Sequence, residues 1–185
     1  MREHSGLYKD KHRQAPDPTP HVPTTHCTRD LRGKDRKNVM TVGWSMPVSI
    51  NPPMVAFGIH PRRYSYALIR ELKEFVVNIP TAKLKGATLL CGKTTGRGHV
   101  KFAETGLTPT LSMTVASPTI KECVASMECK LVNGIVTGDH TLFIGEVTAV
   151  YFTDGSYDRR YALGLLPLLY HLGGNEFVTC NRQVS

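Results

Sequence analysis

The chain has 185 residues, of which 41% are hydrophobic and 21% are charged, and its formal net charge is +8. This length predicts one globular domain with a short extension, and the apolar fraction is sufficient for a buried core. No stretch approaches the roughly 20 apolar residues of a membrane helix, and the N-terminus lacks the apolar segment of a secretory signal. These features exclude a membrane protein, a collagen-like repeat and a small disulfide scaffold.

Residues 1–37 are polar, contain four prolines, and carry nine Lys or Arg against five Asp or Glu. They therefore hold half of the net charge in a fifth of the chain. We expect a basic, partly disordered N-terminal arm over 1–37, followed by one domain over 38–185. Such an arm can attract nucleic acid. A solvated leader is the favoured interpretation, because the basic residues are not interleaved with the aromatic series that stacks on bases.

The five cysteines are an odd number in a chain without a secretion signal, which predicts reduced thiols and a cytoplasmic location. His21, His26 and Cys27 lie close together in the sequence. They lack a second ligand pair at the spacing of a zinc finger, so we expect no metal site.

The first half of the expected domain alternates strands with short helices. Strands are predicted where apolar and β-branched residues cluster between breakers such as Pro52-Pro53 and Pro80, and helices where apolar residues recur at helical spacing. A helix beginning at a Thr81 cap follows from the preference of such residues for that position. The predicted strands are 39–44, Met54–Ile59 and Glu74–Ile79, and the predicted helical segments are Tyr64–Leu72, Thr81–Leu90 and His99–Glu104.

The second half contains two long strand candidates, Ile120–Leu131 and His140–Phe152. The segment between them, 133–139, is rich in turn residues and suits a hairpin. Strands that follow one another directly favour an antiparallel barrel with appended helices over a doubly wound parallel sheet.

Residues 87–94 match a loose phosphate-loop pattern in which Ala87 replaces the first glycine. The interior of this loop would be apolar and bulky, and it follows a helical stretch, whereas a phosphate loop emerges from a strand. A helix that ends at Gly92 is the better interpretation. The GxG at 96–98 does not follow a strand either, so no Rossmann half-domain is expected.

The segment 38–65 is the most informative for function. It joins a strand rich in hydroxyl and amide groups to a basic, aromatic exit, which contains His60, Arg62, Arg63 and Tyr64. This grouping suits a flat polar heterocycle that carries a phosphate, because arginine pairs with phosphate while backbone and hydroxyl groups meet ring edges. An ordinary amphipathic hairpin with a basic surface cluster fits the composition equally well.

A resemblance makes the first alternative specific. The blocks NVMTVGWSMPVSINPPMVAFGIHPRRYSYALI, EFVVNIP, CGKTTGRGHVKF, GLTP, IKECVASMECKL and GDHTLFIGEV occur in this order between residues 38 and 147. The late stretch LLYHLGGNEF completes the series. Together they resemble the flavin reductase-like family of FMN-binding split barrels, in particular its flavoredoxin-type flavoproteins.

The resemblance implies a mainly β fold with short helices, a six-stranded antiparallel split barrel, and FMN bound at a homodimer interface. Arg97 and Lys101 would meet the phosphate, with Phe102 behind them. His140 would lie near the flavin, although it also fits a turn residue, and Trp44 would lie against the ring or in the core. The remaining cofactor-binding residues implied are Asn38, Met40, Thr41, Ser45, Ser49, Arg62, Tyr64 and Ser65.

The implied function is electron transfer through FMN, from NAD(P)H or a redox protein to a flavin, ferric or protein acceptor. A redox-inactive FMN carrier or sensor would share every binding residue, and a basic nucleic-acid-binding module is a third, weaker alternative. No residue is assigned as a catalytic acid, base or nucleophile. One departure concerns the fold: where relatives carry an apolar first strand, residues 21–28 are polar and interrupted by Pro23. The closure of the barrel is therefore left open.

Overall fold

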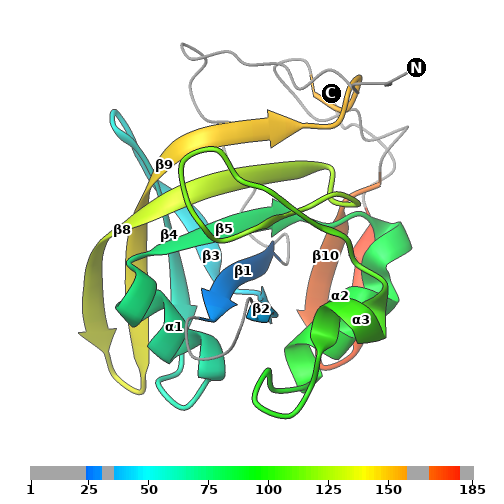
Figure 1. Ribbon diagram of the computed structural model, residues 1–185, viewed down its shortest axis with the longest axis horizontal. Coiled ribbons are helices and arrows are strands. Elements are labelled where there is room, and N and C mark those ends of the chain that lie inside the picture. The colour runs from blue at the N-terminus through cyan, green and yellow to red at the C-terminus, as the bar shows by residue number, and fades with distance from the viewer. Residues whose placement is uncertain (1–23, 31–35, 158–166, 180–185) are drawn as a thin grey trace.

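The computed structural model describes residues 24–30, 36–157 and 167–179. This part of the chain is mainly β with short helices, as predicted (Figure 1). The helices are α1 Tyr64–Leu72, the 3-10 helix η1 Ala82–Leu84, α2 Lys85–Lys93 and α3 Lys101–Thr105. The strands are β1 Thr24–Asp30, β2 Arg36–Val42, β3 Ser45–Ile50, β4 Pro53–Ile59, β5 Glu74–Ile79, β6 Pro109–Thr110, β7 Thr119–Ile120, β8 Ala125–Thr137, β9 His140–Phe152, β10 Leu169–Gly173 and β11 Glu176–Thr179. Among the described residues, no helix is long and apolar enough to cross a membrane.

The main sheet has seven antiparallel strands in the order β2-β1-β5-β8-β9-β4-β3, one strand more than expected. The two ends of this order, β2 and β3, are consecutive in the sequence and are separated only by Gly43 and Trp44. The chain itself therefore links the two edges of the sheet. This arrangement agrees with the predicted barrel.

The described part of the polar segment that left the closure of the barrel open, residues 24–28, belongs to strand β1. Its register with β2 runs from the pair Thr24 and Val42 to the pair Asp30 and Arg36, and it also pairs with β5. Backbone hydrogen bonds on both edges hold this strand, so it does not need an apolar sequence. Residues 24–30 thus belong to the sheet, whereas the expected arm included them. Residues 1–23 of that arm lie outside the described residues.

Most predicted elements agree with the structure, and the differences lie at their ends. Helix α1 and strands β5 and β9 have the predicted bounds. Strand β8 begins five residues later than expected and continues to Thr137, because its pairing with β9 extends to His140. The turn is thereby reduced to Gly138 and Asp139, with Gly138 at a φ of 60°, where glycine is favoured.

The region expected to be one helix from Thr81 to Leu90 contains η1 followed by α2. Thr81 precedes η1, but its side chain makes no capping hydrogen bond. Helix α2 runs through Gly92 to Lys93, so the segment that matched a phosphate-loop pattern is helical, as preferred above. Helix α3 begins at Lys101, two residues later than the predicted helical turn.

Aromatic side chains fill the space inside the sheet. Phe57, Phe75 and Phe143 are almost completely buried, with the rings of Phe57 and Phe75 edge to face at 4.9 Å between centroids. Gly145 lies beneath Phe75, and a Cβ atom there would come within 2.4 Å of the Phe75 Cζ. Burial of each such ring contributes roughly 2–3 kcal/mol to folding.

The loop between β6 and β7 crosses the outer face of β5 and β8 (Figure 1). Glu128, a buried residue of β8, anchors this loop. Its carboxylate accepts hydrogen bonds from the Met113 amide at 2.7 Å, from the Thr114 amide and hydroxyl at 2.6 Å each, and from the Tyr151 hydroxyl. Burial alone would raise the pKa of Glu128, but these donors outweigh it and hold the pKa below its ordinary value.

We expect Glu128→Ala to lower the free energy of unfolding by about 3 kcal/mol at pH 7, because four donors lose a charged acceptor. The folded-state pKa of Glu128 is depressed, so its stabilisation is present above the ordinary value of 4.5 and declines as the pH falls below it. Urea unfolding at pH 7 and at successively lower pH measures the difference between parent and variant. Glu146→Ala, at an exposed position of β9, is the control. A difference that is as large in acid as at pH 7 would contradict the assignment.

Candidate functional site

A cavity of about 140 Å³ lies among strand β2, the beginning of α1 and the segment from α2 to α3. Seven of the predicted cofactor-binding residues line it: Asn38, Met40, Thr41, Arg62, Tyr64, Ser65 and Lys101. Six further residues line it. Arg63 belongs to the predicted basic, aromatic exit but not to the residues implied by the resemblance, and the other five were not predicted: Cys91, Gly92, Thr94, Thr95 and Gly96. The sequence contains an indication that several of them could bind a ligand. Arg63 follows Arg62 directly, and the sequence TTGRG combines two hydroxyl groups with two glycines.

Asn38 presents an unsatisfied acceptor at this cavity. Its side chain is buried and its Nδ2 donates to the Ser65 hydroxyl at 2.7 Å, whereas its Oδ1 has no hydrogen-bond partner among the described residues. Gly96 allows this arrangement, because a Cβ atom at that position would lie 2.2 Å from the Asn38 Oδ1. A buried carbonyl oxygen without a donor costs free energy, and a ligand that supplies an N–H or O–H group would recover it.

Lys101 lines the cavity from the first position of α3, and its side chain is 3% exposed. Its Nζ donates to the backbone oxygens of Val39 and Cys91 at 2.8 Å each, so two of its three protons are used within the protein. Burial lowers the pKa of this amine below its ordinary value. The lysine thus holds β2 against the end of α2, in addition to the phosphate contact predicted for it.

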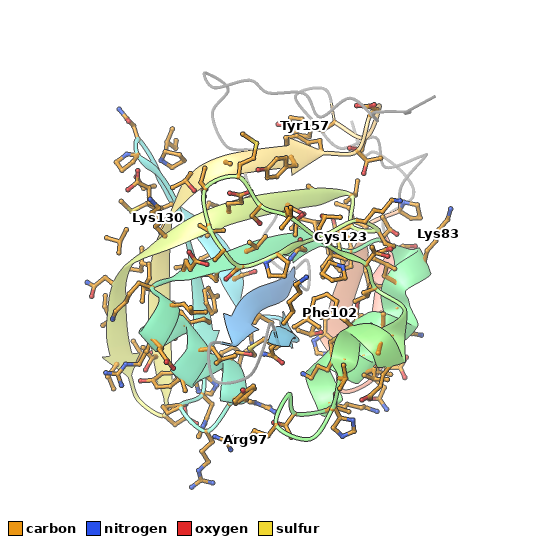
Figure 2. The ribbon with its side chains drawn as sticks, viewed as in Figure 1. Lys83, Arg97, Phe102, Cys123, Lys130 and Tyr157 are labelled. Carbon is orange, nitrogen blue, oxygen red and sulfur yellow. The ribbon has the colours of Figure 1, made fainter. Side chains whose placement is uncertain are left out.

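Arginines give the cavity a positive charge. Arg62 and Arg63 line it, and no acidic side chain does so among the described residues. Arg97 does not line the cavity but reaches its border, where its guanidinium carbon lies 5.6 Å from the centre of the Tyr64 ring. Figure 2 shows Arg97 on the loop between α2 and α3, on the side that faces α1. These positions favour an anionic ligand group.

Phe102 packs behind the cavity and does not line it. Its ring belongs to a buried cluster with Val39, Val76 and Leu107, beneath α3 (Figure 2). Cys91 belongs to the same cluster and also lines the cavity. Burial raises the pKa of the Cys91 thiol to about 11, so it is protonated at neutral pH and is no nucleophile.

A second group of predicted residues forms an aromatic cluster beside the cavity. The rings of Trp44 and His140 lie 4.8 Å apart, and those of His140 and His60 lie 5.3 Å apart. Trp44 is 69% exposed and rests against Gly58, so the alternative of a core tryptophan is wrong. The Arg62 amide donates to the His60 Nδ1 at 3.1 Å, which connects the cluster to the border of the cavity.

His140 begins strand β9 directly after the turn, and its Nδ1 lies 2.7 Å from the Asp139 carboxylate. This hydrogen bond lowers the pKa of Asp139. His140 therefore begins a strand, as one of its two predicted descriptions has it, and it also contacts the exposed tryptophan. Its predicted position near the flavin stays a prediction. Ser45 and Ser49 are half-buried residues of β3 and do not line the cavity.

The comparisons with known proteins agree with this fold. Residues 20–178 match the model of the family described as flavin reductase like domain, and the chain belongs to that family. It is 36% identical over 149 residues to an uncharacterised protein of Archaeoglobus fulgidus, an alignment that covers 80% of this chain and 84% of the relative. The chain is also similar in fold to the flavoredoxin of Desulfovibrio vulgaris, with a TM-score of 0.82, 23% identity and 96% of each chain covered. A further similar structure is an FMN-binding protein from Thermus thermophilus, with a TM-score of 0.80, 24% identity and coverage of 96% of this chain and 99% of that chain.

We expect Lys101→Met to lower the free energy of unfolding by about 2 kcal/mol, because it removes two charge-assisted hydrogen bonds but keeps the length of the side chain. Lys93→Met, at the exposed last residue of α2, should change it by less than about 0.5 kcal/mol. Urea unfolding of both variants makes the comparison. Equal stability of the two variants would show that the Lys101 ammonium does not link β2 to α2.

Proposed function

We propose that this chain is an FMN-binding flavoprotein that passes electrons from NAD(P)H or a reduced redox protein to a flavin, ferric or protein acceptor. The observation that carries the proposal is the cavity itself: among the described residues, its lining includes Asn38, whose side-chain oxygen is unsatisfied, and two arginines but no carboxylate. The donor set fits a ligand that offers N–H or O–H groups at one point and a phosphate at another. Membership of the flavin reductase-like family supports the choice of FMN among such ligands.

The size of the cavity supports a division of the cofactor between two surfaces. Pockets that enclose a whole drug-sized ligand usually measure about 300–1,000 Å³. A cavity of about 140 Å³ therefore suits only one end of FMN. We assign the phosphate end to Arg62 and Arg63, with the hydroxyls of Thr94 and Thr95 as further donors. The ring would extend along the aromatic cluster described above.

Bound FMN would supply the hydride and one-electron chemistry. The residues of this chain would orient it and adjust its environment. Arg62 and Arg63 would neutralise the phosphate, and the Asn38 Oδ1 would accept a hydrogen bond from the ligand. Trp44 and His140 would cover part of one ring face and limit the access of water. No described residue of the cavity is assigned a proton-transfer step.

The homodimer implied by the family resemblance is likewise a proposal. Strand β3 is an edge of the sheet, and alternate positions along it carry large exposed apolar side chains. These are Trp44, just before the strand, and Met46, Val48 and Ile50 within it. An exposed apolar stripe on an edge strand is typical of a protein interface. A second copy of the chain would cover it beside the flavin ring, which sedimentation equilibrium measures.

The phosphate assignment predicts that Arg62→Met combined with Arg63→Met weakens FMN binding by about tenfold. Riboflavin lacks the phosphate, so its affinity should stay within about twofold, since the variant keeps the remaining contacts. Fluorescence titration of both flavins gives the dissociation constants. Lys83→Met changes an exposed cation that does not line the cavity, at the right edge of Figure 2 whereas Arg97 lies at the lower edge, and should alter neither affinity. Equal weakening of both flavins, or no weakening of either, would contradict the assignment.

Electron transfer is separated from the carrier or sensor alternative by adding NADH or NADPH to the FMN-loaded protein without oxygen. Bleaching of the bound flavin supports transfer from a nicotinamide donor. A flavin that neither coenzyme nor a reduced redox protein bleaches would favour the carrier.

A further inference from the structure

A second cavity, of about 290 Å³, lies on another side of α1 from the flavin site. Helix α1 contributes Tyr66 and Arg70 to it, and Lys73 follows at the end of that helix. The remaining walls come from β8 and β9, whose common turn lies near α1 (Figure 1). No described residue lines both cavities. At the start of α1, Tyr64 and Ser65 line the first cavity, whereas Tyr66 lines the second.

The floor of this second cavity is aromatic and apolar. The Tyr66 and Phe143 rings lie 5.3 Å apart, and Leu131 and Val136 add aliphatic surface. Gly134 keeps the wall open, because a Cβ atom there would lie 3.0 Å from the Phe143 ring. The volume is close to the lower limit of ordinary ligand pockets, which suits a molecule of about one ring.

Two exposed cationic residues, Arg70 and Lys73, also line this cavity. The Arg70 guanidinium carbon lies 5.7 Å from the centre of the Tyr66 ring, a distance at which the aromatic face attracts the charge. Lys73 adopts a left-handed backbone conformation that ends α1, and its carbonyl oxygen accepts a hydrogen bond from the Leu131 amide at 2.8 Å. Arg70 from α1 and Lys73 from its C-terminal end therefore both line the cavity. None of the described residues that line it is acidic.

A polar group within the wall also lacks a partner. Thr141 is 3% exposed, and its hydroxyl makes no hydrogen bond to any described residue. Thr141 lines the cavity together with Phe143, which lies two residues further along β9. Unsatisfied buried hydroxyls are uncommon in folded proteins and are typical of places where a ligand or water completes the hydrogen bonding.

We propose that this cavity is a binding site for a small aromatic carboxylate. The ring of the ligand would lie on Tyr66, Leu131 and Phe143, and its carboxylate would meet Arg70 and Lys73 at the border. Arginine and lysine together suit this group, because guanidinium pairs with a carboxylate through two parallel hydrogen bonds. The site requires neither FMN nor electron transfer, so it stands or fails independently of the function proposed above.

Titration of the ¹⁵N-labelled full chain with sodium benzoate, at constant ionic strength, tests the proposal. We expect saturable shifts of the amide resonances of residues 70–73 and 134–141, with a dissociation constant in the millimolar range. Benzyl alcohol has the same ring without the charge and should bind about fivefold or more weakly. Absence of saturation, or saturable shifts confined to residues 62–65 and 94–97 at the first cavity, would overturn the proposal.

Matched variants separate a built site from general attraction by a basic protein. Arg70→Met and Lys73→Met remove one charge each from exposed positions and should weaken benzoate binding by about fivefold. Lys130→Met removes an exposed charge from β8 immediately before Leu131, at a position that does not line the cavity. It should leave the affinity within twofold. Equal weakening by Lys130→Met and Arg70→Met would overturn the proposal, and the dispersion of the amide spectrum shows that each variant is folded.

Discussion

The candidate site depends on one buried ammonium group. Lys101 is withdrawn from solvent, which is costly for a cation, and its two hydrogen bonds to the backbone oxygens of Val39 and Cys91 compensate for that cost. These two oxygens belong to β2 and to the last turn of α2. The same contact therefore fixes Asn38, the neighbour of Val39, opposite the loop that contains Gly96. Lys101 thus joins the two walls of the cavity through these hydrogen bonds.

The proposed flavin site separates charge from aromatic surface. Cations and the unsatisfied Asn38 oxygen belong to a cavity too small for a whole flavin nucleotide, whereas Trp44 and the histidines beside it form an exposed surface. A phosphate needs donors in a partly dry environment, and a flat ring needs apolar contact over a large area. Two segments contribute to both surfaces. Strand β2 and its turn to β3 supply Met40 to the cavity and Trp44 to the aromatic surface, and the exit from β4 supplies Arg62 and His60 in the same way.

The sequence predicts those elements whose pattern is local. Helix α1 and strands β5 and β9 were predicted within their bounds because apolar periodicity and breakers such as Pro80 mark them. The sequence does not predict strand β1, because its polar residues carry no such pattern. The strand forms because it pairs with a neighbour on each edge. Lys101 illustrates the corresponding limit for the site. The family resemblance implies a phosphate contact for it, and the structure adds hydrogen bonds to backbone oxygens 10 and 62 positions away, which no local pattern reveals. Arg63 and Gly96, in contrast, lay within segments already identified.

The most direct test of the account is the visible absorption spectrum of the purified protein after incubation with FMN and desalting. We expect a flavin band that remains with the protein, and a much weaker one after incubation of the Arg62→Met, Arg63→Met variant at the same concentration. A protein that leaves the column colourless, although its circular dichroism shows it to be folded, would contradict the central claim that this cavity binds FMN.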